Sequence, residues 1–209
     1  MVMTLSLPLP PVCRREVLRY AGCREETPAS AALLDACLRE AEPVLTGRVC
    51  WLELPAQTVN EVFSSRDLAK NLSGCDRVVL FAATVGTGLD RLLARYSVLS
   101  PARAVLLQAL GAERVEALCD AFCSRLEAET GMGLRPRFSP GYGDLSLEAQ
   151  TEIFALLQPM RHIGLSLTES LLMSPSKSVT AFVGLTEEKT EKPNKCKLCD
   201  KKDCAYRGG

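Results

Sequence analysis

The apolar positions recur with helical spacing in some segments and form short apolar runs in others, which predicts helices mixed with strands. In residues 101–129 apolar side chains return every three or four positions, the spacing of one face of a helix. This stripe consists of Val115, Leu118, Cys119, Phe122 and Leu126. The pattern predicts a long helix packed on the core, with Asp120 off its apolar stripe and Gly111 as a point where the helix could be interrupted.

Shorter segments complete the predicted set of elements. Further helices are expected over residues 13–21, 29–41, 67–72, 88–96 and 146–158, and strands over residues 47–54 and 76–85. Residues 164–185 are rich in Thr, Val and Phe around Pro175, which predicts strands joined by a turn as an antiparallel pair. Because helices and strands do not alternate regularly, we expect an α+β fold: a single domain with a twisted antiparallel sheet flanked by helices.

The 209 residues divide into one domain with shorter flanking segments. We expect an N-terminal arm at residues 1–12, the domain at residues 13–185, a linker at residues 186–195 and a flexible cysteine-rich tail at residues 196–209. The linker is wholly polar and mixed in charge, which is typical of a flexible connection. The N-terminal arm is apolar, but three prolines interrupt it and it lacks the basic residues of a signal peptide.

Composition excludes several kinds of partner. Lys and Arg equal Asp and Glu at 25 each and aromatic residues make up 5%, which argues against a nucleic-acid or anionic membrane surface. No stretch reaches the roughly 18 apolar residues that a membrane span needs. We therefore expect a cytoplasmic protein that binds no nucleic acid and no membrane. Most of its ten cysteines should then be free thiols.

The stretch from Leu134 to Leu145, LRPRFSPGYGDL, is the strongest candidate for a binding site. Its density of Pro and Gly excludes a helix interior and a central strand. Pro140 and Gly141 fix a turn, because Pro fixes φ and Gly can adopt a positive φ. Arg137 and Tyr142 are then presented from a stiff loop, which suits a small anionic or zwitterionic ligand. A purely structural turn is the alternative.

A second glycine loop, Thr84 to Gly88, lies between a predicted buried strand and a predicted helix. Loops of this kind can hold phosphate groups. However, the dinucleotide-binding pattern requires a third glycine where Arg91 stands, and the Gly-Lys-Ser/Thr ending of a Walker loop is absent. Nucleotide binding at this loop is therefore disfavoured.

The segments from Glu16 to Leu185 together resemble the activation domain of cobalamin-dependent methionine synthase, and most closely its stand-alone bacterial form. The Arg-x-x-x-Gly-Tyr motif of that family is matched by Arg137, Gly141 and Tyr142. The family's later segments are matched at fitting distances by the sequences Leu-Thr-Glu-Ser, at residues 167–170, and Ser-Val, at residues 178–179. The short motif would be weak by itself, but the combination is specific.

The resemblance implies binding of S-adenosylmethionine and reductive methylation of an inactive corrinoid cofactor. In the family the motif arginine and tyrosine contact the ligand, and an acidic residue of the preceding long helix contributes. These roles fall on Arg137, Tyr142 and Asp120, although the family has Glu where Asp120 stands. An arginine fork suits the ligand carboxylate, and Gly141 leaves room for the backbone to approach. Gly143 replaces a family proline, and we expect it to loosen the turn.

The cobalamin itself is expected on a partner. The Asp-x-His-x-x-Gly motif that binds cobalamin is missing, and the only histidine is His162. The partner would be the corrinoid-binding subunit of a split methionine synthase, or another corrinoid protein, together with an electron donor protein. The chain would then serve methionine biosynthesis as the activation subunit of a methyltransferase, without turning over alone.

The tail carries Cys196, Cys199 and Cys204 within nine residues, a spacing that favours metal ligation by thiolates. An iron–sulfur cluster, zinc and no metal all remain open, because only three ligands are local. A cluster on this tether could deliver the electron that reactivation needs. Two rival functions are a non-enzymatic, metal-tailed interaction module with a vestigial ligand pocket, and an independent methyltransferase. The second is disfavoured because no acceptor-activating base adjoins the motif.

Overall fold

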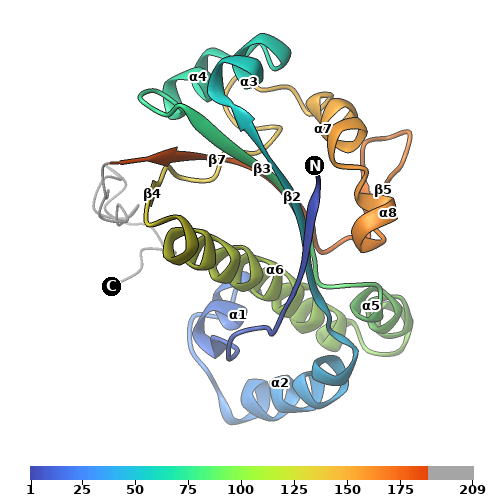
Figure 1. Cartoon of the computed structure of the whole chain (residues 1–209). Helices are drawn as coiled ribbons and strands as arrows, with labels where there is room; N and C mark the ends of the chain where they lie inside the picture. The colour runs from blue at the N-terminus through green and yellow to red at the C-terminus, as the bar shows by residue number, and fades with distance from the viewer. Residues whose placement is uncertain (188–209) are drawn as a thin grey trace.

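The computed structural model describes residues 1–187, and its centre is a five-stranded antiparallel sheet in the order β1–β2–β3–β7–β4 (Figure 1). The strands are β1 (Met3–Leu7), β2 (Gly47–Pro55), β3 (Arg77–Thr84), β4 (Gly133–Leu134) and β7 (Ser178–Thr186). The predicted α+β class with a curled antiparallel sheet flanked by helices is confirmed. The predicted cysteine-rich tail lies outside the described residues.

Helices cover both faces of the sheet (Figure 1). On one side lie α1 (Arg14–Tyr20), α2 (Pro28–Ala41), the 3-10 turn η1 (Glu42–Val44), α5 (Gly88–Leu99) and α6 (Pro101–Thr130). On the other lie α3 (Ala56–Val62), α4 (Arg66–Asn71), α7 (Ala149–Leu157) and α8 (Pro159–Ile163). A small separate hairpin is formed by β5 (Ser166–Leu167) and β6 (Met173–Ser174).

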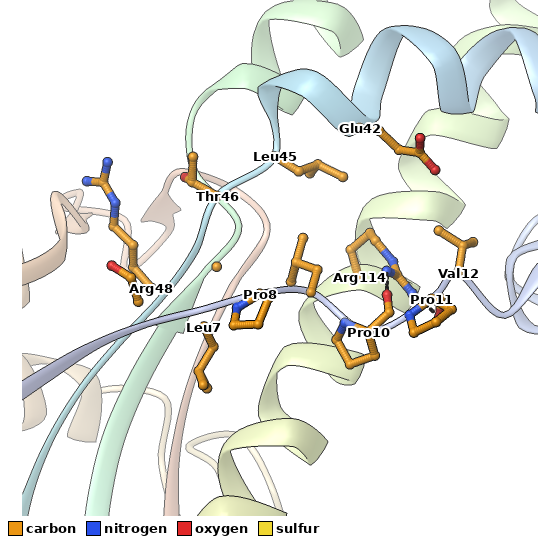
Figure 2. A pocket seen from close by; sticks show the side chains of 13 residues that line it. Leu7, Pro8, Pro10, Pro11, Val12, Glu42, Leu45, Thr46, Arg48 and Arg114 are labelled. Carbon is orange, nitrogen blue, oxygen red and sulfur yellow. Dashed lines mark hydrogen bonds between the residues drawn. The ribbon is translucent and has the colours of Figure 1, made fainter.

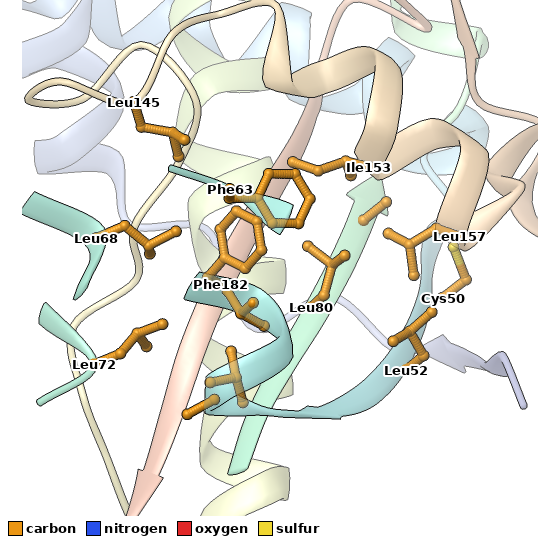
Figure 3. Close-up of a cluster of buried hydrophobic side chains, with 14 of the residues drawn as sticks. Cys50, Leu52, Phe63, Leu68, Leu72, Leu80, Leu145, Ile153, Leu157 and Phe182 are labelled. Carbon is orange, nitrogen blue, oxygen red and sulfur yellow. The ribbon is translucent and has the colours of Figure 1, made fainter. Parts of the chain in front are cut away.

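The central strand β3 is buried on both faces, which explains its nearly continuous apolar sequence. Successive side chains point to opposite faces of a sheet. Val78, Leu80 and Ala82 therefore join the cluster beneath α3, α4 and α7, whereas Val79, Phe81 and Ala83 join the cluster beneath α6. In the first cluster the rings of Phe63 and Phe182 meet edge to face with their centroids 4.9 Å apart (Figure 3).

Helix α6 runs for 30 residues without a break, and its predicted apolar stripe is buried. The interruption considered at Gly111 is absent from this helix. A side chain there has no room, because a Cβ on Gly111 would lie 2.4 Å from Leu89 of α5 and 2.8 Å from the stem of Lys177. The glycine thus permits close packing of α5 and Lys177 against α6. No helix within residues 1–187 combines the length and the apolarity needed to cross a bilayer.

Two predicted elements take different positions in the structure. Part of the N-terminal arm forms the edge strand β1, which pairs with β2 until the prolines that follow Leu7 end it. The antiparallel pair predicted in residues 164–185 exists only as the short β5–β6 hairpin. The longer strand β7 instead enters the main sheet between β3 and β4, because its residues are nearly all buried and need cover on both faces.

A buried ion pair fastens the N-terminal arm to the middle of α6. Figure 2 shows its arginine, Arg114, beside Pro10 and Pro11 of the arm. Arg114 and Glu113 are 2% and 5% exposed and contact each other. Arg114 also donates to the carbonyl oxygens of Pro10 and Pro11, while Glu113 accepts from the backbone N–H of Cys13 at 3.0 Å. The arm therefore satisfies charges that α6 would otherwise bury alone, beside a cavity of about 710 Å³.

Replacing one partner of this pair should be costly. Arg114→Met should lower the free energy of unfolding by about 3–5 kcal/mol, because the Glu113 charge is left buried and unpaired. The control is Arg125→Met, since Arg125 forms an exposed i,i+4 pair with Glu129 and should contribute about 0.5 kcal/mol or less. Urea unfolding followed by circular dichroism measures both. Equal losses in the two variants would contradict the assigned role of the buried pair.

Candidate functional site

The chain after α6 changes face at the edge of the sheet, and this positions Arg137. Leu134 packs with the cluster under α6, whereas Phe138 packs with the opposite cluster and bridges to Phe182 of β7. In a regular strand residues 134 and 138 would share one face. Leu134 pairs with Leu185 and Phe138 with Phe182, so one extra residue lies between the two pairings and the face changes. The Arg137 side chain is directed back to α6.

Arg137 is held by two carboxylates of α6. Its Nη1 donates to Asp120 Oδ1 at 2.6 Å, and its Nη2 donates to Glu116 Oε2 at 2.7 Å. Glu116 and Asp120 are four residues apart and so lie on the same face of the helix. The arginine side chain is 23% exposed, and the carboxylate side chains are 46% and 69% exposed. We call Arg137, Glu116 and Asp120 the Arg137 cluster.

The structure thus brings two of the predicted site residues, Arg137 and Asp120, into direct contact. Glu116 was missed by the sequence reasoning. The available signal was its position one helical turn before Asp120, which places a second carboxylate on the same face. The cluster is reachable from solvent while its arginine is mostly covered. Such an arginine can exchange a protein carboxylate for a ligand carboxylate without large movement of the backbone.

The surroundings of the cluster keep Arg137 charged. Burial alone would lower the pKa of Arg137, but Cys119 and Asp120 beside it raise the pKa above its ordinary value. Cys119 is itself a buried thiol whose pKa is raised by burial. Tyr20 of α1 lies on the other side of Glu116, and its pKa is raised by burial and by the Glu116 charge. Tyr20 also lines a groove of about 670 Å³ between α5 and α6.

The predicted turn forms, but its tyrosine is not in contact with the cluster. Gly141 adopts a φ of 88°, and its N–H donates to the carbonyl of Leu145 at 2.8 Å. Tyr142 is 60% exposed, and its ring packs edge to face against Phe138 at 6.2 Å. Around Gly141 the nearest atom to an added Cβ would be 4.0 Å away, on Leu147. Gly141 and Tyr142 therefore form an accessible rim, and contact with a ligand remains a prediction.

Gly143 fastens this turn instead of loosening it. Its φ is +54° and an added Cβ would lie 2.3 Å from Asp67 Oδ2, so only glycine fits. A proline could not adopt this backbone, because its ring fixes φ near −65°. The close approach lets Asp67 accept from the Asp144 N–H at 3.1 Å. Asp144 in return accepts from the Ser65 hydroxyl and from the N–H groups of Arg66 and Asp67.

The second glycine loop is explained by packing. A Cβ on Gly86 would lie 2.4 Å from the Thr46 hydroxyl, and one on Gly88 would lie 2.4 Å from the Val44 carbonyl. Both glycines thus allow the start of α5 to lie against the turn before β2. Within residues 1–187 no three His, Cys, Asp or Glu side chains gather as a metal site. The predicted ligands Cys196, Cys199 and Cys204 lie beyond the described residues.

The fold and the Arg137 cluster define an α+β domain with a charged site at one edge of its sheet. The family described as vitamin B12 dependent methionine synthase, activation domain, matches residues 123–191. Among solved structures, the MetH reactivation domain bound to AdoHcy matches with a TM-score of 0.64 and 15% identity, over 91% of this chain and 80% of that chain. The comparison with curated proteins gives no match. The resemblance to the methionine synthase activation domain is thereby confirmed, with the motif residues inside the matched segment.

The close approach at Gly143 can be tested by adding one methyl group. Gly143→Ala should lower the free energy of unfolding by more than the roughly 1–2 kcal/mol expected for a left-handed alanine, because Asp67 must also move. Gly131→Ala is the matched control, since Gly131 has a φ of +69° and no atom within 4 Å of an added Cβ. Thermal and urea unfolding give both values. A Gly143→Ala loss no larger than that of Gly131→Ala would contradict the packing argument.

Asp144 should make stability depend on pH in acid. Hydrogen bonds from Ser65 and from the backbone of Asp67 and Arg66 lower the pKa of Asp144 to about 2. A carboxylate with a lowered folded-state pKa stabilises above its unfolded pKa of about 4 and loses that contribution as pH falls through about 2. The difference in unfolding free energy between wild type and Asp144→Asn should therefore be constant near neutral pH and shrink below about pH 4.

The control for this titration is Asp76→Asn, because Asp76 is exposed and its side chain has no hydrogen bond in the described part of the chain. The same measurement on Asp76→Asn gives the background for an Asp→Asn change at an exposed position. A difference between wild type and Asp144→Asn that persists undiminished as the pH falls toward 2 would contradict the assigned role of Asp144.

Proposed function

We propose that the chain binds S-adenosylmethionine at the Arg137 cluster and supports reactivation of a corrinoid methyltransferase, as the activation subunit of a split cobalamin-dependent methionine synthase. The observation that carries the proposal is a mostly covered arginine between two accessible carboxylates of α6. This arginine lies inside the segment that matches the activation-domain family, residues 123–191. A similar fold is that of the MetH reactivation domain bound to AdoHcy, the demethylated form of the proposed ligand.

The cluster suits an amino-acid ligand. Arg137 offers two N–H groups in a planar fork, which match a carboxylate in bidentate fashion. Entry of the ligand carboxylate displaces Asp120 or Glu116 from the guanidinium, and the displaced carboxylate is then available to the ligand ammonium. The amino-acid end brings one charge of each sign, so the exchange leaves the net charge of the cluster unchanged. Gly141 and Tyr142 at the rim are the proposed further contacts.

The methyl transfer requires little chemistry from this chain. One electron from a donor protein would reduce the inactive corrinoid on the partner, and the reduced corrinoid would supply the nucleophile that forms the new bond to the methyl carbon. The methyl carbon leaves the sulfonium, and the electron pair of the broken S–C bond stays on sulfur as a neutral thioether. No proton is removed, which agrees with a cluster that contains no histidine. The role of Arg137 and Asp120 is to hold the amino-acid end and thereby orient the methyl group.

Calorimetric titration of S-adenosylmethionine into the full chain tests this function. Arg137→Ala should weaken binding by about 10- to 150-fold, because hydrogen bonds to a charged group contribute roughly 1.5–3 kcal/mol. Arg125→Ala is the control, since Arg125 lies on α6 but pairs with Glu129 away from the cluster. Wild-type binding that survives in Arg137→Ala would contradict the assigned site.

The identity of the partner is a separate part of the proposal. A corrinoid protein of another methyltransferase would also fit, and co-purification with candidate corrinoid proteins separates the two. The rival interaction module predicts an intact fold that binds no S-adenosylmethionine. If the chain alone binds none, the titration is repeated with a corrinoid protein present. Binding under that condition alone would show that the partner completes the site.

We also propose that Cys196, Cys199 and Cys204 bind an iron–sulfur cluster or zinc. What supports this is three thiolates in nine residues after a polar linker, where they cannot serve a core. Anaerobic purification should give either a brown protein with reducible absorbance or a colourless protein with zinc, and Cys199→Ser should lose the metal. Cys13→Ser, at an exposed cysteine far from the tail in sequence, should keep it. A metal content of zero in wild type would overturn the proposal.

A further inference from the structure

The Arg137 cluster contains one carboxylate more than charge balance requires. Arg137 contributes one positive charge, whereas Glu116 and Asp120 contribute two negative charges at 2.7 and 2.6 Å from it. A zwitterionic amino-acid end brings one charge of each sign and leaves this excess unchanged. The cluster is therefore suited to a ligand that carries a further positive charge close to its amino-acid end.

Glu116 is the carboxylate placed to meet that charge. It lies one helical turn from Asp120 toward the start of α6, and Ala112, Ala109 and Gln108 follow on the next turns as the floor of the groove of about 670 Å³. Tyr20 borders both this groove and Glu116. A ligand anchored by its amino-acid end at Arg137 and extending into the groove must pass Glu116.

We infer that Glu116 is a specificity residue that favours the methylated sulfonium over the demethylated thioether. This inference rests on the proposed function. S-adenosylmethionine carries its positive sulfur three bonds from the α-carbon, whereas S-adenosylhomocysteine is neutral at the same atom. The two ligands are otherwise nearly identical in shape. An excess negative charge beside the sulfur therefore attracts the methyl donor and releases its product, which prevents the product from occupying the site between reactivations.

The same groove contains a charge that limits the effect. Lys177 lines it as well, with its stem against Gly111 of α6, and is about half-buried with a pKa lowered by burial. Asp90 lies beside Lys177 and opposes this shift, so these two charges compensate each other. The excess negative charge that attracts a sulfonium is therefore that of the Arg137 cluster. Because Glu116 is 46% exposed, the interaction is screened by water and should weaken as salt is added.

The test compares three compounds on the full chain by calorimetry: S-adenosylmethionine, S-adenosylhomocysteine and sinefungin, whose amine places a positive charge where the sulfonium lies. Glu116→Gln keeps an acceptor for Arg137 but removes the charge. The preference of wild type for the two cationic compounds over S-adenosylhomocysteine should fall about three- to tenfold in this variant. Glu116→Asp should retain most of the preference, and Glu152→Gln on the exposed face of α7 should retain all of it.

The outcomes separate this inference from the proposed function. If Glu116 serves only to hold Arg137, then Glu116→Gln weakens all three compounds by the same factor, and the role as a specificity residue is overturned. A preference for the cationic compounds that is unchanged in Glu116→Gln and does not respond to salt also overturns the role of Glu116 as a specificity residue. If wild type binds none of the compounds, with or without a corrinoid protein, the proposed function itself fails.

Discussion

The burial of β3 and β7 on both faces is the constraint on which the rest of the structure depends. Both strands are buried at almost every position, so helices must cover the sheet from two sides. Helix α6 covers one face and α3, α4 and α7 cover the other. Where the chain returns from α6 to the outer edge of β7, it passes from one layer to the other. Arg137 lies at that crossing and is therefore directed at α6.

The Arg137 cluster needs little beyond this arrangement of helices and sheet. A long helix that carries two carboxylates on one turn faces the sheet edge, and the crossing segment supplies one arginine. The adjoining turn is tied to α4 through Asp67 and Asp144, which holds the rim in place. The domain thus offers a preformed cluster of charges, which under the proposed function holds a zwitterion and transfers no proton. This division of labour suits a domain that presents a reactive ligand to a partner.

Much of this could be predicted from the sequence, and the exceptions have physical reasons. The apolar stripe of α6 and the buried strand β3 are local patterns, and both were located correctly. The membership of β7 in the main sheet and the edge strand β1 depend on long-range pairing, which periodicity does not reveal. Glu116 was missed because one carboxylate on an exposed helix face is ordinary until its distant partner is known.

Gly143 is a second residue whose role depends on a contact distant in the sequence. Against the family pattern it suggested a looser turn, since glycine is the most flexible residue. Its positive φ and the approach of Asp67, 76 positions earlier in the sequence, give it the reverse role. The family resemblance indicated Arg137 and Asp120 as ligand-binding residues, and the structure places their side chains in contact. Local chemistry alone favoured a purely structural turn.

The most direct test of the account is a crystal structure of the full chain grown with saturating S-adenosylmethionine. The account predicts the ligand carboxylate on the Arg137 guanidinium, with at least one of Glu116 and Asp120 released toward the ligand's positive charges. Arg137 still paired with both carboxylates, and the ligand bound elsewhere, would contradict the assignment of this cluster as the binding site.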